Sequence, residues 1–363
     1  MILLLGATGL LGHNVLRLLL ERGEAVRVLA RPGSRLFIGN GVQYGAFCTP
    51  DTDFSESGGQ NTALCTPEII RGSILDHDTL LGAARGCSAI INCAGTTDMS
   101  LPQTADFYPV NRDLPILLCR VLEETGIPTL VHTSTANTIA PGPREHPTDE
   151  SAPFAPPFDR SPYAISKKEG EERLLAWAAE HPERRVVIVN PGFMLGAWDP
   201  KPSSGTLMLA ACRRPAFRPG KSEVRGRPLM AGPGGGKSFL HVRDAATAIC
   251  NALQRGPTGR YLLTGQSLTL KEFYTLQART CGYRQRFLTL PDALMNLAGR
   301  LGDLAQKLGI RTMVCKHNTD QLLIEEWYDC GKAERELGLP HTPVRDAIRD
   351  FFEWHSTFPG VNN

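Results

Sequence analysis

The sequence predicts an α/β protein in which a parallel β-sheet carries helices on both of its faces. The chain opens with a short apolar run, a glycine-rich turn and an amphipathic segment, which is the order strand, turn, helix. Three further apolar runs, at 89–92, 129–132 and 186–189, each follow a segment with helical spacing. Repeated alternation of strand and helix is typical of a parallel sheet wound in both directions.

The opening segment has the pattern of a βαβ unit. Ile2–Leu5 is wholly apolar, Leu11–Arg22 carries apolar residues at helical spacing, and Ala25–Ala30 reads as a second strand. A unit of this kind at the start of an alternating chain predicts a Rossmann-type doubly wound sheet.

The middle of the chain contains two irregular stretches. Leu36–Pro67 lacks apolar periodicity, so we expect a long loop that is either disordered or a mobile flap over a bound ligand. Pro141–Pro162 is rich in proline and leads into a helix that begins near Tyr163. Both stretches are expected to form walls of a cleft.

The C-terminal half is less regular, with glycine and proline clustered at 215–236. The elements expected beyond it are a strand at Phe239–Val242, a helix at Arg243–Gln254, a strand at Tyr261–Thr264 and mostly helix over 268–358.

Composition excludes several classes of protein. The formal charge is only +2 and no long basic run is present, so nucleic acid is not an expected partner. No stretch approaches the roughly 18 apolar residues of a membrane span, so a membrane partner is not expected either. The ten cysteines include no CxxC pair, and neither they nor the histidines have metal-ligand spacing. We therefore expect free thiols, a cytoplasmic location and no catalytic metal.

The glycine-rich turn predicts a dinucleotide site. It lies between the first strand and the first helix, where glycines allow a tight turn, close approach of a pyrophosphate and close helix packing. The helix N-terminus offers free N–H groups to the phosphates. The residues expected to contact the cofactor here are Gly6, Thr8, Gly9, Leu10, Leu11 and Gly12.

The end of the second strand indicates which dinucleotide binds. An acidic residue there would accept hydrogen bonds from the ribose hydroxyls of NAD, but this chain has Arg31 at that place. Because arginine suits a 2′-phosphate, we expect NADP, with NAD as the alternative.

Tyr163 and Lys167 form a candidate catalytic pair. They are four residues apart in a helix that Ser161-Pro162 introduces, so both side chains lie on one face. A nearby ammonium group favours the phenolate, and Tyr163 can then exchange a proton with a substrate hydroxyl while hydride moves at the adjacent carbon. Ser134 and Thr135 follow a strand that ends beside the same cleft, and either hydroxyl is a candidate to bind the reacting oxygen.

Together these segments resemble the extended short-chain dehydrogenase/reductase family, also called the NAD-dependent epimerase/dehydratase family, and particularly its dihydroflavonol-4-reductase-like branch. The likeness covers nearly the whole chain. The motifs that carry it are GATGLLG at 6–12, INCAG at 91–95, VNRDLP at 110–115, VHTSTAN at 131–137, YAISK at 163–167, NPGFMLG at 190–196 and FLHVRDAATAI at 239–249.

The resemblance implies a catalytic trio of Thr135, Tyr163 and Lys167, with threonine where the family usually has serine; Ser134 stays a second candidate. Relatives commonly carry a Gly-Asp pair beside the adenine, where this chain has Gly72-Ser73. The further cofactor contacts expected are Ser73, Ile74, Ala94, Gly95, Asn111, Pro191, Gly192, Phe193 and Met194, and Tyr163 and Lys167 are expected to contact the cofactor as well as the substrate.

We therefore expect an NADP-dependent oxidoreductase that reduces a ketone or aldehyde, or oxidises the corresponding alcohol, of a small-molecule substrate. Phe193, Trp198 and Phe217 suggest that a bulky apolar substrate is tolerated. A nucleotide-sugar epimerase or dehydratase that uses NAD and a non-catalytic dinucleotide sensor remain alternatives, and a homodimer is left open.

The expected domain division follows from the same reasoning. Residues 1–192 are expected to form the dinucleotide-binding domain, to which the segment 237–265 returns. The segments 193–236 and 266–363 are expected to form the smaller, C-terminal substrate-binding lobe.

Overall fold

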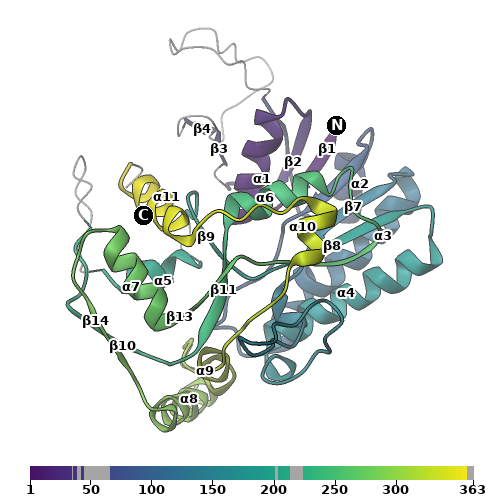
Figure 1. The fold of residues 1–363 in the computed structure, drawn as a ribbon. Coiled ribbons are helices and arrows are strands. Elements are labelled where there is room, and N and C mark those ends of the chain that lie inside the picture. Colours follow the sequence, from purple (N-terminus) through teal and green to yellow (C-terminus); the bar gives the residue numbers. More distant parts are fainter. Residues whose placement is uncertain (35, 39–41, 45–65, 201–202, 213–223, 358–363) are drawn as a thin grey trace.

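In this computed structural model the described part of the chain comprises residues 1–34, 36–38, 42–44, 66–200, 203–212 and 224–357. Its main feature is a seven-stranded sheet with the order β12-β8-β7-β6-β1-β2-β5 (Figure 1). Every pairing between neighbouring strands of this sheet is parallel. Its strands are β1 (Ile2–Leu5), β2 (Val26–Ala30), β5 (Glu68–Arg71), β6 (Ala89–Asn92), β7 (Thr129–Thr133), β8 (Arg185–Pro191) and β12 (Gly259–Leu263).

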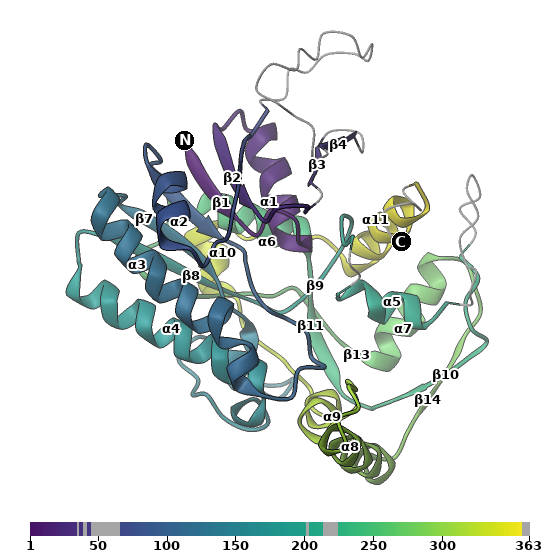
Figure 2. The same ribbon diagram turned by 180° about the vertical axis from the view of Figure 1, so that it is seen from behind.

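Helices cover both faces of the sheet, as Figures 1 and 2 show from opposite sides. The helices on one face are α1 (Leu10–Glu21), α6 (Val242–Asn251) and α10 (Gly331–Leu337), and those on the other are α2 (His77–Ala84), α3 (Leu114–Thr125) and α4 (Pro162–Glu180). Alternate residues of β1 enter the two cores, Leu4 on the α1 side and Leu3 and Leu5 on the α3 side. The strand is apolar at every position because both of its faces are buried. The predicted doubly wound fold is confirmed.

The element bounds agree with the sequence for the central strands and differ at the sheet edge. The expected loop over Leu36–Pro67 is wrong at its start, where β3 (Leu36–Ile38) and β4 (Val42–Tyr44) pair antiparallel. β5 was missed altogether, because a four-residue edge strand with exposed ends carries little apolar periodicity. Residues 45–65, on which the prediction of a flap or disorder rests, lie outside the described residues.

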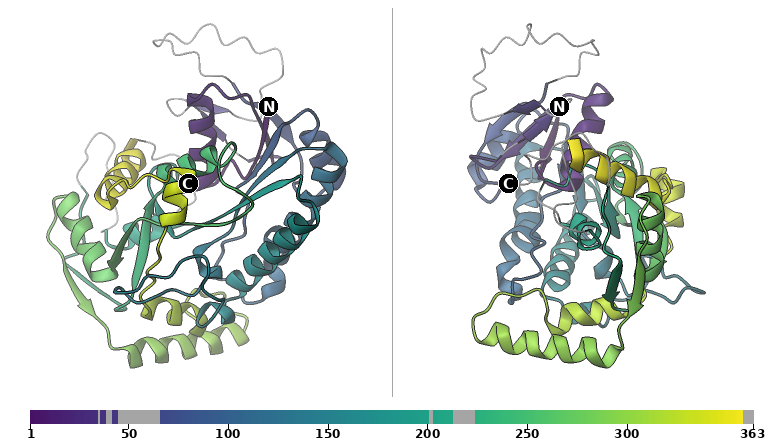
Figure 3. Two further views of the ribbon diagram at one scale, coloured as in Figure 1. Left: turned by 45° about the vertical axis from the view of Figure 1, so that its right-hand side comes forward. Right: turned by 90° about the vertical axis from the view of Figure 1, so that its left-hand side faces the viewer.

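The rest of the chain adds two small sheets beside the large one. β9 (Phe193–Leu195), β11 (Gly236–His241) and β13 (Gln266–Thr269) form a three-stranded sheet, while β10 (Leu229–Gly232) pairs with β14 (Arg286–Thr289). The helices of this lobe are α5 (Gly205–Ala210), α7 (Leu270–Thr280), α8 (Asp292–Lys307), α9 (Lys316–Leu323) and α11 (Val344–Thr357). Figure 3 shows α8 along the rim of the molecule that is far from the N-terminus.

The lobe differs from the sequence prediction in two respects. β14 interrupts the expected helical region over 268–358, and β11 ends at His241, so that Val242 already begins α6. β11 pairs with β9 and β13, whereas β12 joins the large sheet. The chain therefore crosses between the two parts within 237–265, and the domain boundaries stay a prediction.

Two further sequence expectations concern cysteines and membranes. The eight cysteines in the described residues are all free, and most of them are buried; Cys48 and Cys65 lie outside those residues. Among the described helices, none has the combined length and apolar character that crossing a bilayer requires.

Candidate active site

The candidate site residues gather where the parallel strands end. The glycine-rich turn follows β1, Ala94 and Gly95 follow β6, and Ser134 and Thr135 follow β7. α4 begins beside them because Ser161 accepts a hydrogen bond from the backbone N–H of Ala164 and Pro162 occupies the first helical turn. This edge is where doubly wound sheets bind ligands.

Lys167 is buried at the base of the site. It is 3% exposed, and its Nζ donates a hydrogen bond of 3.0 Å to the backbone carbonyl of Thr133. Burial lowers the pKa of Lys167 from 10.5 to about 8, while the nearby Glu171 acts in the opposite direction. An added Cβ at Gly95 would lie 3.1 Å from this Nζ, so the loop after β6 passes close to the lysine.

Tyr163 lies one helical turn before Lys167, as the sequence predicted. Burial of its phenol raises the pKa of Tyr163, and a hydrogen bond with Thr135 partly offsets that rise. The ring packs edge-on against Phe107, with centroids 6.1 Å apart. Contrary to the expectation that the nearby ammonium group would favour the phenolate, burial outweighs it, and the phenol is protonated at neutral pH.

The structure distinguishes the hydroxyls of Ser134 and Thr135, between which the sequence could not choose. The Thr135 side chain lies on the Tyr163 side and lowers the pKa of that phenol, whereas the buried Ser134 hydroxyl lies on the Glu171 side and lowers the pKa of that carboxyl. The Ser134 oxygen does not reach a regular hydrogen-bond geometry there and has no partner among the described residues. Thr135 is therefore the better placed of the two to bind an oxygen that Tyr163 also contacts.

Glu171 is a residue that the sequence reasoning missed. It is fully buried, and its Oε1 accepts hydrogen bonds from Thr138 Oγ1 at 2.8 Å and from Asn190 Nδ2 at 2.5 Å. Asn190 Nδ2 also donates to the backbone carbonyl of Thr135 at 3.1 Å, and the single proton of Thr138 Oγ1 is shared with that oxygen, which lies 2.9 Å away. Glu171 therefore supports the groups that hold Thr135 in place. Its position four residues after Lys167 was a signal in the sequence, since Tyr163, Lys167 and Glu171 share one helix face.

Asn111 closes the other side of the site. It belongs to η2 (Pro109–Asp113), and its side chain exchanges hydrogen bonds with both backbone groups of Thr96, at 2.9 and 3.0 Å. Its Nδ2 also donates to Ser166 Oγ on α4 at 3.0 Å. Asn111 therefore fixes the loop after Gly95 against α4, and its contact with the cofactor stays a prediction.

The glycine-rich turn has room for a ligand on only one side. An added Cβ at Gly6 would meet the backbone of Ala94 at 2.5 Å, and one at Gly12 would meet the Gly6 carbonyl oxygen at 2.2 Å. At Gly9 the nearest atom would be that same oxygen, at 3.7 Å. Gly9 is the N-cap of α1 and provides no side-chain cap, so the first N–H groups of the helix are open to an anion.

Two arginines lie where the second and third strands of the large sheet end. Arg31 follows β2, and its carbonyl oxygen accepts a hydrogen bond from Ser34 Oγ at 2.7 Å. Arg71, the last residue of β5, donates through Nη1 to the Ser34 carbonyl oxygen at 3.0 Å. Arg71 was missed because β5 was missed. Both arginines are exposed, and together they make this corner basic.

The predicted adenine contacts lie next to that corner. Gly72 donates its N–H to the Ala30 carbonyl oxygen at 3.0 Å, which places Ser73 and Ile74 directly after the paired ends of β2 and β5. Ser73 is exposed, and its hydroxyl accepts a hydrogen bond of 3.1 Å from the N–H of Leu75.

Four predicted cofactor contacts lie at the border with the lobe, whereas one aromatic residue predicted for the substrate side packs elsewhere. Pro191 ends β8, Gly192 follows it, and Phe193 and Met194 begin β9 at the border between the two parts of the chain. Trp198, by contrast, stacks on His13 of α1 with centroids 4.7 Å apart. The expectation that Trp198 faces the substrate is therefore not supported, and Phe217 lies outside the described residues.

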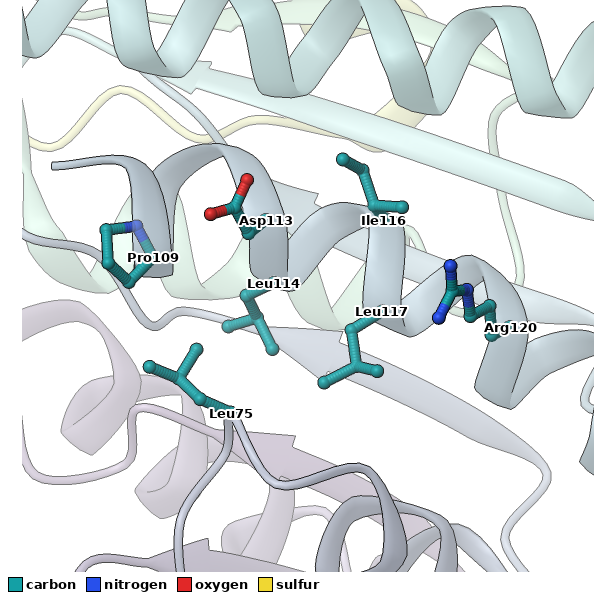
Figure 4. Close-up of a pocket in the computed structure, with 7 residues that line it drawn as sticks. All are labelled: Leu75, Pro109, Asp113, Leu114, Ile116, Leu117 and Arg120. Carbon is teal, nitrogen blue, oxygen red and sulfur yellow. The ribbon is translucent and has the colours of Figure 1, made fainter. Parts of the chain in front are cut away.

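A pocket of about 340 Å³ lies away from these residues, between the segment after β5 and α3 (Figure 4). Leu75 approaches it from one side, and Leu114 and Leu117 approach it from the other. Its lining residues are Leu75, Pro109, Asp113, Leu114, Ile116, Leu117 and Arg120. Because Tyr163, Lys167 and Thr135 do not line it, this pocket is separate from the candidate reaction centre.

The structure brings together three side chains of kinds that can bind a metal ion, which their spacing in the sequence did not indicate. Ligand atoms of Cys330, Glu334 and His341 lie within 4.8 Å of one another. His341 Nε2 is 2.7 Å from Glu334 Oε1, and burial raises the pKa of the Cys330 thiol. A protonated thiol beside a histidine–glutamate pair explains this arrangement without an ion.

The family model for the NAD dependent epimerase/dehydratase family matches residues 2–265. The chain belongs to this family. It is accordingly an NAD(P)-dependent oxidoreductase of the extended short-chain dehydrogenase/reductase type, as the sequence motifs indicated. The matched range includes every residue predicted for the catalytic and cofactor sites.

Three curated relatives match over most of their length. Sterol demethylase protein B of Methylococcus capsulatus is 26% identical over 97% of this chain and 97% of its own. A putative dihydroflavonol 4-reductase of Synechocystis is 27% identical over 96% and 92%. A 4-hydroxy-2-methyl-3-oxo-4-farnesyl-3,4-dihydroquinoline-1-oxide ketoreductase of Stigmatella aurantiaca is 26% identical over 95% and 94%.

Solved structures share the fold at low identity. The crystal structure of gox2253 has a TM-score of 0.76 at 24% identity and covers 100% of this chain and 99% of that one. A UDP-glucose 4-epimerase of Thermotoga maritima, solved with UDP-glucose, has a TM-score of 0.67 at 18% identity, covering 97% of each chain. These likenesses support the fold of this family member and not a particular substrate.

Proposed function

We propose that this chain is an NADP-dependent carbonyl reductase that converts a ketone or aldehyde of a bulky apolar substrate into the alcohol, or catalyses the reverse oxidation. The observation that carries the proposal is the placement of the buried Lys167, whose Nζ donates to the Thr133 carbonyl oxygen just before Ser134 and Thr135, one helical turn after Tyr163. These groups lie at the strand ends, beside a glycine-rich turn whose Gly9 has no neighbour that would exclude a phosphate.

The chain supplies the groups that carbonyl reduction requires. When bound, a reduced nicotinamide supplies the hydride. The hydroxyl of Thr135 donates a hydrogen bond to the substrate oxygen, and Tyr163 donates the proton that this oxygen gains. A tyrosine phenol is already protonated at neutral pH, and burial raises the pKa of Tyr163 further, so the proton is present to be donated. Lys167 is charged below about pH 8 and stabilises the phenolate that remains after proton transfer.

The choice of NADP rests on the basic corner at Arg31, Ser34 and Arg71. No acidic residue follows β2, and two exposed arginines lie there. Charge-assisted hydrogen bonds from arginine are matched to a phosphate. In the variant Arg31→Glu, we expect NADPH to bind about tenfold more weakly while NADH binding changes little. Fluorescence titration of each reduced cofactor measures both affinities; equal losses for the two would remove the support for NADP.

The substrate class rests on the relatives. Two carry names that include a sterol and a farnesylated ring system, and a third is named for a flavonoid ring. Phe193, at the border with the lobe, packs against Phe239 with centroids 5.5 Å apart, which adds aromatic surface on the lobe side. A ketone on a fused or prenylated ring system is therefore the substrate class we propose.

A substrate panel tests the proposal. NADPH oxidation by the purified protein is followed against ring ketones of increasing apolar area, with small water-soluble ketones for comparison. Turnover that rises with apolar area is the expected result. Tightly retained NAD together with interconversion of nucleotide sugars would instead support an epimerase, and cofactor binding without turnover over the whole panel would support a dinucleotide sensor.

A further inference from the structure

Helix α8 exposes a continuous row of leucines, called here the leucine stripe. Its members are between 49% and 71% exposed, although leucine is a residue type that folded proteins usually bury. They recur at spacings of three and four residues, which places them on one side of the helix. The stripe consists of Leu294, Leu297, Leu301, Leu304 and Leu308.

The opposite side of α8 packs tightly, so the outward direction of the stripe is fixed. An added Cβ at Gly302 would lie 1.4 Å from the carbonyl oxygen of Val314, and one at Gly299 would lie 2.4 Å from Thr319 Oγ1 on α9. Only glycine permits this close approach. Asp303 also faces inward, where its carboxylate accepts a hydrogen bond of 2.8 Å from the Lys316 N–H.

The surface around the stripe is apolar, and two basic residues of α8 lie near it. Ile310, Met313 and Val314, in the connection from α8 to α9, are 49% to 60% exposed and continue the apolar surface. Arg300 and Lys307 lie on α8 between members of the stripe in sequence, and neither is in an ion pair in the described chain. An apolar helix face with basic residues beside it is the composition of helices that lie in the interface of an anionic membrane.

The stripe is connected to the candidate reaction centre through α9. Asn318 donates a hydrogen bond of 3.0 Å to the carbonyl oxygen of Met99, in the segment after β6. Asn137, whose N–H donates to Thr135 Oγ1 at 3.3 Å, donates through its side chain to Gln321 Oε1 at 3.4 Å. The helix pair α8–α9 therefore joins the exposed leucines to the segment that contains Thr135.

We infer that the leucine stripe docks this protein on the surface of an anionic lipid bilayer, from which an apolar substrate reaches Tyr163. The statement that an apolar substrate reaches Tyr163 from the bilayer rests on the proposed function. A bilayer fits better than a second copy of α8, because a self-paired stripe would bring the basic residues of two copies together. The sequence-based expectation of no membrane partner considered only segments that span a bilayer, whereas this contact needs no span.

Vesicle flotation tests the inference with the full chain and no substrate. Vesicles of phosphatidylcholine with phosphatidylglycerol are compared with vesicles of phosphatidylcholine alone. The protein should float with the anionic vesicles and much less with the neutral ones. Replacing Leu297 and Leu301 together by glutamate should reduce binding at least about tenfold, because two apolar side chains lose their burial. Leu75→Glu, at an exposed leucine far from α8, is the matched control and should bind normally.

Three outcomes would overturn the inference: no flotation, flotation that the stripe variant does not reduce, or a dimer in light scattering that the stripe variant dissociates. The last result would assign the stripe to a second copy. Thermal unfolding confirms that the variant remains folded. Flotation requires no turnover, so it can be interpreted even if the proposed carbonyl reduction is not observed. Likewise, a failure to float does not affect the reaction assay.

Discussion

Helices α4 and α8 both break the usual pattern of burial, but in opposite ways: α4 buries charged residues, and α8 exposes leucines. α4 turns Lys167 and Glu171 inward, where they are 3% and 0% exposed, whereas α8 turns leucines such as Leu301 and Leu308 outward, at 58% and 71%. Buried charge and exposed apolar surface both cost stability, and in each helix they repeat at helical spacing. We propose that the two stripes serve function: chemistry at α4 and contact with lipid at α8.

The largest expected effect is at the phenol of α4. Tyr163→Phe removes the proton donor and keeps the ring, so turnover should fall about 10²-fold or more. NADPH affinity should stay within a factor of about two, since the hydroxyl is assigned to the substrate and not to the phosphates. Steady-state kinetics and a cofactor titration measure the two quantities. Wild-type turnover on the true substrate would show that α4 does not carry the chemistry.

Lys167 gives the next largest effect, which depends on pH. Its pKa in the folded protein is lowered to about 8 from 10.5. Between these values the unfolded chain binds a proton that the native state has released, so the contribution of Lys167 to the unfolding free energy rises with pH. The wild type should therefore gain on the order of 3 kcal/mol over Lys167→Met between pH 8 and 10.5. Urea unfolding of both proteins at these pH values measures the difference.

The same titration predicts the pH dependence of catalysis. kcat/KM should decline above about pH 8, when Lys167 loses the charge that stabilises the phenolate. A stability difference that does not change with pH would mean that Lys167 is solvated rather than buried, and the comparison with α8 would lose its main evidence.

Substitutions of Glu171 should have a smaller effect on stability and turnover. Comparing alanine with glutamine distinguishes the role of its hydrogen bonds from that of its charge. Glu171→Ala removes the carboxylate acceptor of Thr138 and Asn190 and leaves them only the Thr135 carbonyl oxygen, so the unfolding free energy should fall by about 1–3 kcal/mol and kcat by about tenfold. Glu171→Gln retains an acceptor oxygen and removes the buried charge, and should recover most of both losses. If the glutamine variant were as impaired as the alanine variant, the carboxylate charge would be required and not only its hydrogen bonds.

The smallest effect is expected on α8. Leu301→Ala, in the stripe, should change the unfolding free energy by less than about 0.5 kcal/mol, because the side chain is already exposed to water. Leu118→Ala, on the buried face of α3, should cost about 2–5 kcal/mol. Chemical denaturation in the absence of lipid compares them. A large loss at Leu301 would show that the stripe packs within the protein.

The sequence anticipated elements whose signals are local. The apolar run of β1, the spacing of α1 and the pair Tyr163 and Lys167 depend on residues within one or two helical turns of each other. β5, Arg71 and Glu171 were not anticipated. β5 is a short strand at the sheet edge, Arg71 gains its meaning only from the neighbouring β2, and Glu171 needs Asn190 and Thr138 as partners from other elements.

Motifs in the sequence indicated the family. By itself, the sequence also determined the doubly wound sheet and the glycine-rich turn, and it predicted the pair Tyr163 and Lys167. These follow from periodicity and spacing, which the chain carries wherever its other parts lie. Only the tertiary structure decided that Thr135 and not Ser134 lies on the side of the phenol, that Trp198 turns toward α1, and that the leucines of α8 face outward. Each of these outcomes depends on which distant residue occupies the neighbouring space, and a pattern along one segment does not contain that information.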